Sequence, residues 1–128
     1  MLYRLLRQNE SIEDGLWAKD LNSETSVFLH VTKGSYGKSK YISKCGSYEA
    51  VDYLKSKSKQ LGKIVKIDED KLLSNNVNII DLRNQNTRAF HIDNSATAEL
   101  INTFNNFANT FNEVLLVDHV PKSCLIDD

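Results

Sequence analysis

Three residues of this sequence carry a charge or a hydroxyl group where a side chain could reach a ligand. Arg4 interrupts the apolar segment 2–6, and Ser43 ends a short extended segment just before a capped helix. Glu113 immediately precedes the aliphatic segment 114–117 and would project from a sheet end into an adjoining cleft. An isolated guanidinium is not buried, so Arg4 must reach a partner carboxylate or an anionic ligand. Taken singly, the three are also typical of a surface salt bridge, a turn hydroxyl and a solvated acid, so their chemistry depends on the fold.

Short apolar and β-branched segments predict the strands that would position these residues. The predicted strands cover residues 2–6, 27–31, 41–43, 63–67, 77–82, 114–117 and 125–126. A helical turn is expected over 11–15, with Ser11 as its cap and Gly15 as a left-handed exit. Segment 34–37 is expected to be a loop.

Two amphipathic segments predict helices. One begins after Ser47, which can cap the first backbone N–H groups, and ends at Gly62. The other begins at Ser95 and places phenylalanines at helical spacing as far as Phe111. Five to seven short strands and two or three helices, partly segregated along the chain, predict an α+β fold with a mixed or antiparallel sheet.

Length and composition exclude several classes of protein. The chain has 128 residues, the size of one domain spanning 1–128, and 16 Lys plus Arg against 17 Asp plus Glu. This balance argues against an electrostatically driven nucleic-acid or membrane-surface binder. No apolar run approaches the ~20 residues of a membrane span, so no membrane partner is expected. The two cysteines and three histidines lie far apart, which predicts reduced thiols and no metal site.

Several short motifs stand in a distinctive order. Tyr3 precedes Arg4 in the first strand, an Ile-Ser pair ending at Ser43 precedes the first long helix, and Glu113 opens a late strand. The accompanying motifs are Ile12–Leu16, Leu29–Val31, Ser39–Ser43, Ile64–Asp68, Asn112–Leu115 and Val120–Pro121. Over most of the chain, this series resembles the ADP-ribosyltransferase superfamily of the Arg–Ser–Glu type, to which the cholera-toxin-like enzymes belong. The resemblance implies a compact fold of split mixed or antiparallel sheets flanked by two or three helices.

The resemblance also implies a reaction. Enzymes of this type cleave the nicotinamide–ribose bond of NAD, their substrate, and transfer ADP-ribose to a macromolecular acceptor. Glu113 would stabilise the positive charge that develops on the ribose, as carboxylates do at glycosidic carbons. Arg4 would hold the phosphates with its bidentate fork. Ser43 would orient Glu113 or the nicotinamide ribose.

The remaining residues expected to bind NAD are less specific. Tyr41 and Tyr53, with Tyr36 and Tyr48, are candidates for the aromatic side chain that contacts nicotinamide. His30 either borders the pocket or satisfies the core, and the core role is favoured.

The sequence departs from the family pattern at two places, which leaves the acceptor open. Only the last serine of the usual Ser-Thr-Ser motif is present, at Ser43. Phe111 stands where arginine-modifying members carry a second Glu or Gln, so another side chain, a nucleic acid, a small molecule or water is the expected acceptor. The alternatives are an NAD glycohydrolase that uses the same residues and a catalytically silent binding module with this fold. A toxin or effector role would place the protein in the cytoplasm of its own or a target cell, with an antitoxin or other protein as partner.

Overall fold

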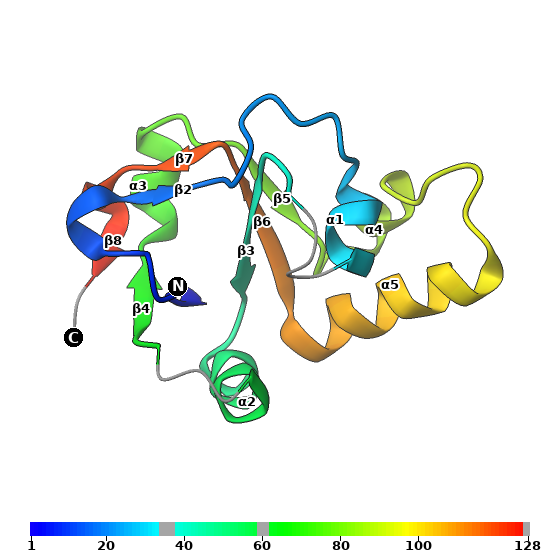
Figure 1. Cartoon of the computed structure of the whole chain (residues 1–128), viewed down its shortest axis with the longest axis horizontal. Coiled ribbons are helices and arrows are strands. Elements are labelled where there is room, and N and C mark those ends of the chain that lie inside the picture. Colours follow the sequence, from blue (N-terminus) through cyan, green and yellow to red (C-terminus); the bar gives the residue numbers. More distant parts are fainter. Residues whose placement is uncertain (34–37, 59–61, 127–128) are drawn as a thin grey trace.

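The computed structural model describes residues 1–33, 38–58 and 62–126, which form an α+β fold with two antiparallel sheets (Figure 1). The larger sheet has the strand order β5-β6-β3-β1-β4-β8. These strands are β1 (Leu2–Leu5), β3 (Tyr41–Cys45), β4 (Ile64–Ile67), β5 (Ile79–Asp81), β6 (Glu113–Val117) and β8 (Leu125–Ile126). The smaller sheet pairs β2 (Leu16–Trp17) with β7 (His119–Val120). The α+β class and the split into antiparallel sheets are therefore confirmed.

The large sheet is divided near its middle. Strands β3 and β6 align five residue pairs, and β1 and β4 align four. By contrast, β1 and β3 align only at Tyr3 and Cys45. Arg4 follows Tyr3 and Ser43 precedes Cys45, so in this antiparallel pair both residues lie on the same side of the Tyr3–Cys45 contact, one on each side of the division. The sheet thus consists of two well-paired halves, β5-β6-β3 and β1-β4-β8, which separate where the two predicted site residues lie.

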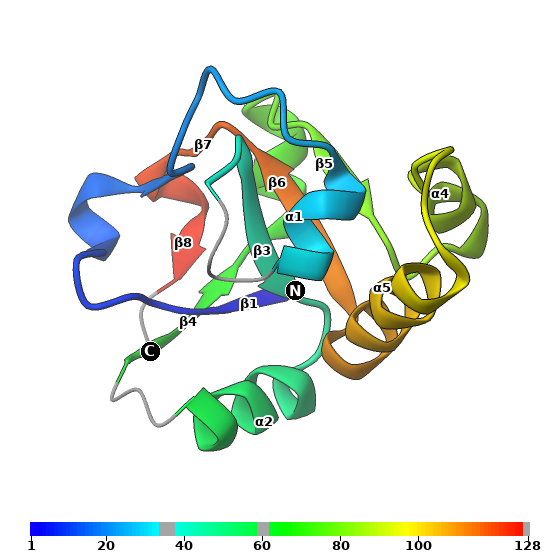
Figure 2. The ribbon, with the colours of Figure 1, turned by 45° about the vertical axis from the view of Figure 1, so that its right-hand side comes forward.

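Side chains alternate between the two faces of the sheet, and each face carries its own core. One core contains Leu2, Ile42 and Val65 and lies on the side of α3 (Glu69–Ser74) and the small sheet. The other face is covered by α1 (Val27–Lys33), α2 (Tyr48–Ser58) and α5 (Ala98–Phe111), and α5 contacts both of the other helices. The arrangement of the three helices beside the sheet can be followed in Figures 1 and 2. Alternation places Ser43 and Glu113 on this helical face.

Both predicted helices form, the first over Tyr48–Ser58 and the second with a shifted start. Residues 59–61, over which the first was predicted to continue, lie outside the described residues. The hydroxyl of Ser47 accepts the Ala50 N–H at 3.2 Å and begins α2. Helix α5 begins at Ala98 rather than at Ser95, because the Thr97 hydroxyl provides its N-terminal cap at 3.2 Å from the Leu100 nitrogen. It ends where Asn112 adopts the left-handed conformation at φ 46°.

The short turn over 11–15 is also present, as the 3₁₀ helix η1 (Ile12–Asp14). Gly15 follows it with φ 70°, and an added Cβ would lie 2.6 Å from the carbonyl oxygen of Val120. Glycine is therefore required at this position for the chain to pass so close to β7.

The prediction of a strand over 27–31 is wrong, because this segment forms helix α1. Val27, Phe28 and Val31 are buried together in the core cluster that contains Phe104 of α5. The Ser26 hydroxyl accepts the Leu29 N–H at 3.1 Å at the start of the helix. Packing against α5 and this cap outweigh the β propensity of the valines.

Two further helices, α3 (Glu69–Ser74) and α4 (Gln85–Phe90), were not expected. Each is only six residues long and mostly polar, so neither shows helical periodicity. Asp68 and Asn84 cap them through side-chain oxygens. The expected loop 34–37 lies outside the described residues. None of the helices that the structure describes is sufficiently long and apolar to span a bilayer.

Candidate functional site

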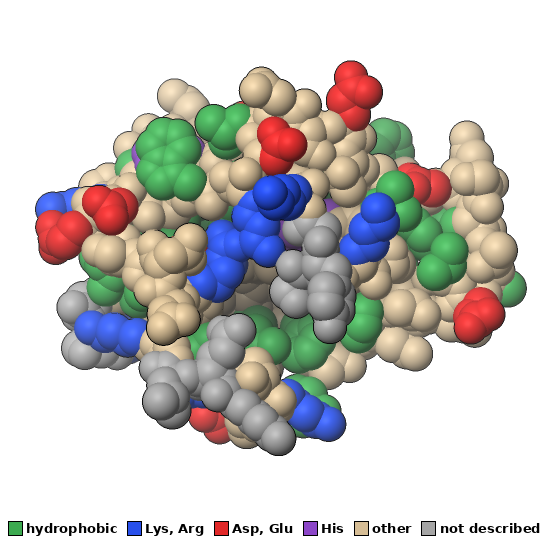
Figure 3. All heavy atoms as spheres, viewed as in Figure 1, with side chains coloured by type: hydrophobic (Ala, Val, Ile, Leu, Met, Phe, Trp, Pro, Cys, Tyr) green, Lys and Arg blue, Asp and Glu red, His purple; other side chains and the backbone are tan. Residues whose placement is uncertain are grey.

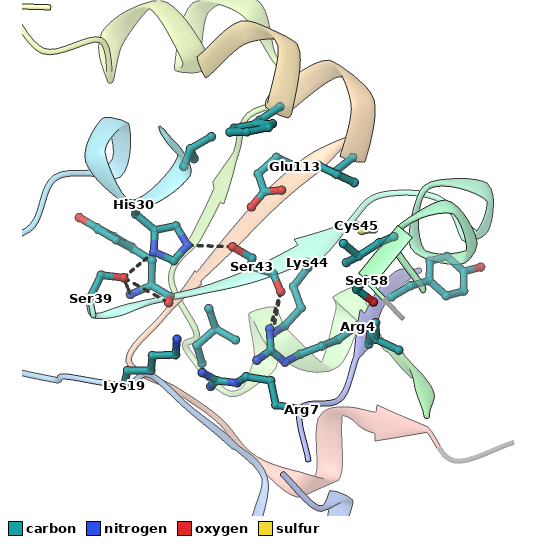
Figure 4. Close-up of a pocket in the computed structure, with 18 residues that line it drawn as sticks. Arg4, Arg7, Lys19, His30, Ser39, Ser43, Lys44, Cys45, Ser58 and Glu113 are labelled. Atoms are coloured by element: carbon teal, nitrogen blue, oxygen red, sulfur yellow. Dashed lines mark hydrogen bonds between the residues drawn. The ribbon is translucent and has the colours of Figure 1, made fainter. Parts of the chain in front are cut away.

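A cavity of about 330 Å³ lies at the division of the large sheet. Its volume falls within the range of small-molecule sites. It is lined from both halves of the sheet and from helices α1, α2 and α5 (Figure 4). Its polar side chains include Arg4, Arg7, Lys19, His30, Ser43 and Glu113.

A chain of hydrogen bonds runs along one wall of this cavity (Figure 4). The Tyr41 N–H donates to Ser39 Oγ at 3.2 Å, and Ser39 Oγ lies 2.5 Å from His30 Nδ1. His30 Nε2 in turn lies 2.8 Å from Ser43 Oγ, and the Ser43 hydroxyl is hydrogen-bonded to the Glu113 carboxyl group. Three elements, α1, β3 and β6, therefore meet through their side chains at one point.

The proton positions in this chain follow from the partners. Burial, together with the nearby charges of Arg4 and Lys19, lowers the pKa of His30 to about 4, so the ring is neutral near pH 7 and carries one N–H. An ionised Glu113 can only accept, so Ser43 donates its proton to it and accepts from His30 Nε2–H. His30 Nδ1 then accepts the hydroxyl proton of Ser39.

Glu113 is the carboxylic acid among the described residues that line the cavity. It is buried at the start of β6, 7% exposed, in register with Cys45. Burial raises its pKa to about 7, against the opposing effects of the Ser43 hydrogen bond and the charges of Lys44 and Arg4. A carboxyl group in a cavity that changes charge near neutral pH is a feature of functional sites.

Arg4 has a partner carboxylate, which is one of the two outcomes that its sequence setting allowed. Its Nη2 donates to both oxygens of Glu10 at 2.9 Å, and its Nε donates to Oε1 at 3.2 Å. Its Nη1 donates to the Ser43 carbonyl oxygen at 2.8 Å, across the division of the sheet. Burial alone would raise the pKa of Glu10, but the charge and hydrogen bonds of Arg4 and bonds from Arg7 lower it to about 2. Arg4 thus ties the two halves together, and its contact with phosphates stays a prediction.

Sequence reasoning missed several charged residues of the cavity. Lys44 is almost fully buried and donates to the Ser43 carbonyl oxygen at 3.3 Å, and burial holds its pKa well below the usual range. Lys44 stands two residues after the core residue Ile42 in the same strand, and strand alternation places both side chains on one face. This spacing could have predicted that Lys44 is buried. Arg7 and Lys19, and also Glu10, which binds Arg4 without lining this cavity, had no such signal, because they lie in loops whose paths depend on tertiary contacts. Lys and Arg side chains gather beside a hollow near the middle of the face in Figure 3.

The fold brings together most of the residues that the sequence singled out. Arg4, Ser43, Glu113, His30 and Tyr41 all line the cavity.

Two other predicted aromatic contacts are placed differently. Tyr53 is not among the lining residues: it is 43% exposed on α2, with its ring 6.2 Å from that of Phe111. Tyr48 is half exposed and contacts Tyr3 edge to face. Tyr36 lies outside the described residues. The pocket wall of α2 and α5 is instead formed by Leu54, Phe107 and Phe111.

Both cysteines, Cys45 and Cys124, are buried free thiols. Within the described ranges, no three or more His, Cys, Asp or Glu side chains are grouped so that they could hold a metal ion. Comparisons of the chain with models of protein families, with curated proteins and with solved structures gave no match.

Proposed function

We propose that this protein is an ADP-ribosyltransferase that cleaves the nicotinamide–ribose bond of NAD and transfers ADP-ribose to a macromolecular acceptor. The observation that carries the proposal is the convergence of Arg4, Ser43 and Glu113 on one cavity, although 39 and 70 residues separate them. Their order along the chain resembles that of the Arg–Ser–Glu type of this superfamily. The cavity also joins cations to a buried carboxyl group, which suits a substrate with anionic phosphates and a developing positive charge.

The chemistry assigns Glu113 the central role. When the bond between ribose C1′ and the nicotinamide nitrogen breaks, its electron pair leaves with neutral nicotinamide and the ribose becomes oxocarbenium-like. A buried carboxylate beside the ribose stabilises that charge more strongly than a solvated one would. The acceptor then forms a bond to C1′ and releases its proton. Glu113 is the catalytic residue, and it acts in its ionised form.

Ser43 and His30 serve Glu113 as positioning residues. With His30 neutral, its Nε2–H is directed to Ser43 Oγ, which turns the Ser43 hydroxyl proton toward the carboxylate. This arrangement fixes one carboxylate oxygen and leaves the other for a ribose hydroxyl. The role of His30 proposed here replaces the purely structural one that the sequence favoured.

The decisive experiment compares Glu113→Gln with the wild type in the release of nicotinamide from NAD. The amide keeps the shape but loses the charge, so we expect a fall of about two to three orders of magnitude with NAD binding retained. Glu99→Gln is the matched control, because Glu99 is exposed in the first turn of α5, and its activity should equal that of the wild type. Equal turnover in Glu113→Gln would remove the proposal.

Hydrolysis of NAD with water as acceptor is the second candidate. Phe111 lines the cavity and offers no carboxylate that could activate an arginine acceptor beside Glu113. Incubation with NAD labelled in the adenosine half separates the two reactions, since a transferase leaves label on macromolecules and a hydrolase produces only free ADP-ribose. A binding module would show neither product, and the occupation of Arg4 by Glu10 is the feature that favours it.

A further inference from the structure

A second cavity, of about 500 Å³, adjoins the first. The two share Arg7 and Lys19, and the walls of the second come from the segment after β1, from η1 and β2, and from Lys38. The proposed reaction occupies the first cavity with nicotinamide and its ribose. A dinucleotide extends well beyond these groups, and the second cavity is the adjoining space that the described residues provide.

Arg7 stands between the two cavities with unused hydrogen-bonding capacity. Its Nε is buried and has no hydrogen-bond partner in the part of the chain that the structure describes. Its Nη2 makes only a long contact of 3.4 Å with Glu10, whose carboxylate is held mainly by Arg4. A buried guanidinium N–H without a partner is unfavourable, and an anionic oxygen placed there would satisfy it.

The charges around Arg7 favour an anion. Arg7, Lys19 and Lys38 all line the second cavity. Burial and the charges of Arg7, Arg4 and Lys38 lower the pKa of Lys19, against the opposing charge of Glu10. Glu10 and Asp14 are the acids that line the second cavity with these cations, and Glu10 is already paired with Arg4. The hollow in Figure 3 is accordingly bordered by Lys and Arg side chains.

Trp17 provides a fixed aromatic surface at the second cavity. Its indole stacks on the His119 ring at 3.7 Å and 25°, and its Nε1 donates to the Asp14 carbonyl oxygen at 3.1 Å. Trp17 nevertheless remains 50% exposed and lines the cavity. An aromatic side chain held in one orientation and open to solvent is suited to stacking with a planar base.

We infer that the second cavity binds the adenosine diphosphate portion of the dinucleotide, with the diphosphate on Arg7 and the adenine beside Trp17. The identity of this ligand rests on the proposed function. In this arrangement Arg4 organises the division of the sheet, whereas Arg7 makes the contact with phosphate that the sequence assigned to Arg4.

The test uses Trp17 as its own reporter, because it is the single tryptophan of the chain. Titration of the whole protein with ADP should change its intrinsic fluorescence, whereas nicotinamide riboside, which lacks both diphosphate and adenine, should not. Arg7→Gln should weaken ADP binding by about ten- to a hundredfold, as for the loss of hydrogen bonds to a charged group. Arg7→Lys should retain part of the affinity. Arg83→Gln, which alters an arginine outside both cavities, should bind like the wild type.

The outcomes distinguish a failure of the ADP site from a failure of the proposed reaction. ADP binding that leaves Trp17 fluorescence unchanged, or that Arg7→Gln does not weaken in a variant with native circular dichroism, would overturn the inference. If the wild type releases nicotinamide while Arg7→Gln keeps the same KM for NAD, the reaction stands and the inference is wrong. If ADP binds through Arg7 but NAD is never cleaved, the site stands and the reaction is wrong.

Discussion

The two halves of the large sheet contribute different chemistry to the cavity between them. The β5-β6-β3 half, with α1, supplies a chain of mostly neutral groups that ends at Glu113. The β1-β4-β8 half, with the segment after β1, supplies the ion pair of Arg4 with Glu10 and the partly unsatisfied Arg7. A site that must stabilise a developing cation and hold an anionic diphosphate needs both environments. Burial nevertheless outweighs the charges of Lys44 and Arg4 at Glu113, so the pKa of this carboxyl group stays raised.

The largest effect on stability is expected from breaking the ion pair of Arg4 with Glu10 in the β1-β4-β8 half. Glu10→Ala leaves the buried Arg4 without its carboxylate, and removal of one partner of a buried pair costs about 3–5 kcal/mol. Urea denaturation at pH 7 measures this loss in the free energy of unfolding. The control is Glu13→Ala, which removes an exposed pair with Lys122 and should cost less than about 1 kcal/mol. Equal losses in the two variants would contradict the role of Glu10.

The Glu10 pair also predicts a pH dependence. Because the pKa of Glu10 is lowered to about 2 in the folded protein, its contribution to stability is present above its ordinary value of 4.5. That contribution is lost as the pH falls from about 4.5 toward 2. Glu10→Ala should therefore lose less stability than the wild type over this acidic range.

In the β5-β6-β3 half, Glu113 should make the stability of the fold depend on pH in the opposite sense. Its pKa is raised from 4.5 to about 7 in the folded protein, so the folded state binds the proton more tightly than the unfolded chain. This contribution to stability is present below pH 4.5 and is lost as the pH rises through 7, with a magnitude of about 3 kcal/mol. Glu113→Gln has no carboxyl group to ionise there. We expect it to be less active than the wild type but more stable at pH 8.

Thermal unfolding of both proteins at pH 5 and pH 8 measures this difference. The advantage of Glu113→Gln should appear only at the higher pH. A constant difference between the two proteins at both values would show that burial does not perturb this carboxyl group.

The contrast between the halves also explains what could be predicted from the sequence. The apolar pattern of the sequence predicts strands β1, β3, β4 and β6 directly. Ser43 and Glu113 belong to β3 and β6, and the resemblance predicted that these two side chains lie close together. Helix α1 was missed because Val27 and Val31 favour a strand locally and become helical only through packing against α5. Glu10 and Arg7 lie in a polar segment, and no local sequence pattern predicts that this segment folds back over Arg4.

The smallest expected effect is on kcat and tests whether His30 positions Ser43 in the β5-β6-β3 half. His30→Ala removes the N–H that orients Ser43, so we expect kcat to fall by about tenfold, the lower end of the range for losing a group that orients a functional side chain, with KM for NAD unchanged. His30→Gln can still donate through its amide and should recover part of kcat. His91→Ala, which alters a histidine outside both cavities, should leave kcat unchanged.

The pH profile distinguishes positioning from a merely structural role. The Ser43 hydrogen bond lowers the pKa of Glu113 against the effect of burial, so its misorientation in His30→Ala should raise that pKa further. Activity depends on the ionised carboxylate, and the acidic limb of the rate profile, near pH 7 in the wild type, should therefore move to higher pH. If His30 only fills the core, its loss would lower the free energy of unfolding and leave the limb in place. If neither the acidic limb nor kcat changes in His30→Ala, His30 has no positioning role, and Glu113 and Ser43 alone act from the β5-β6-β3 half.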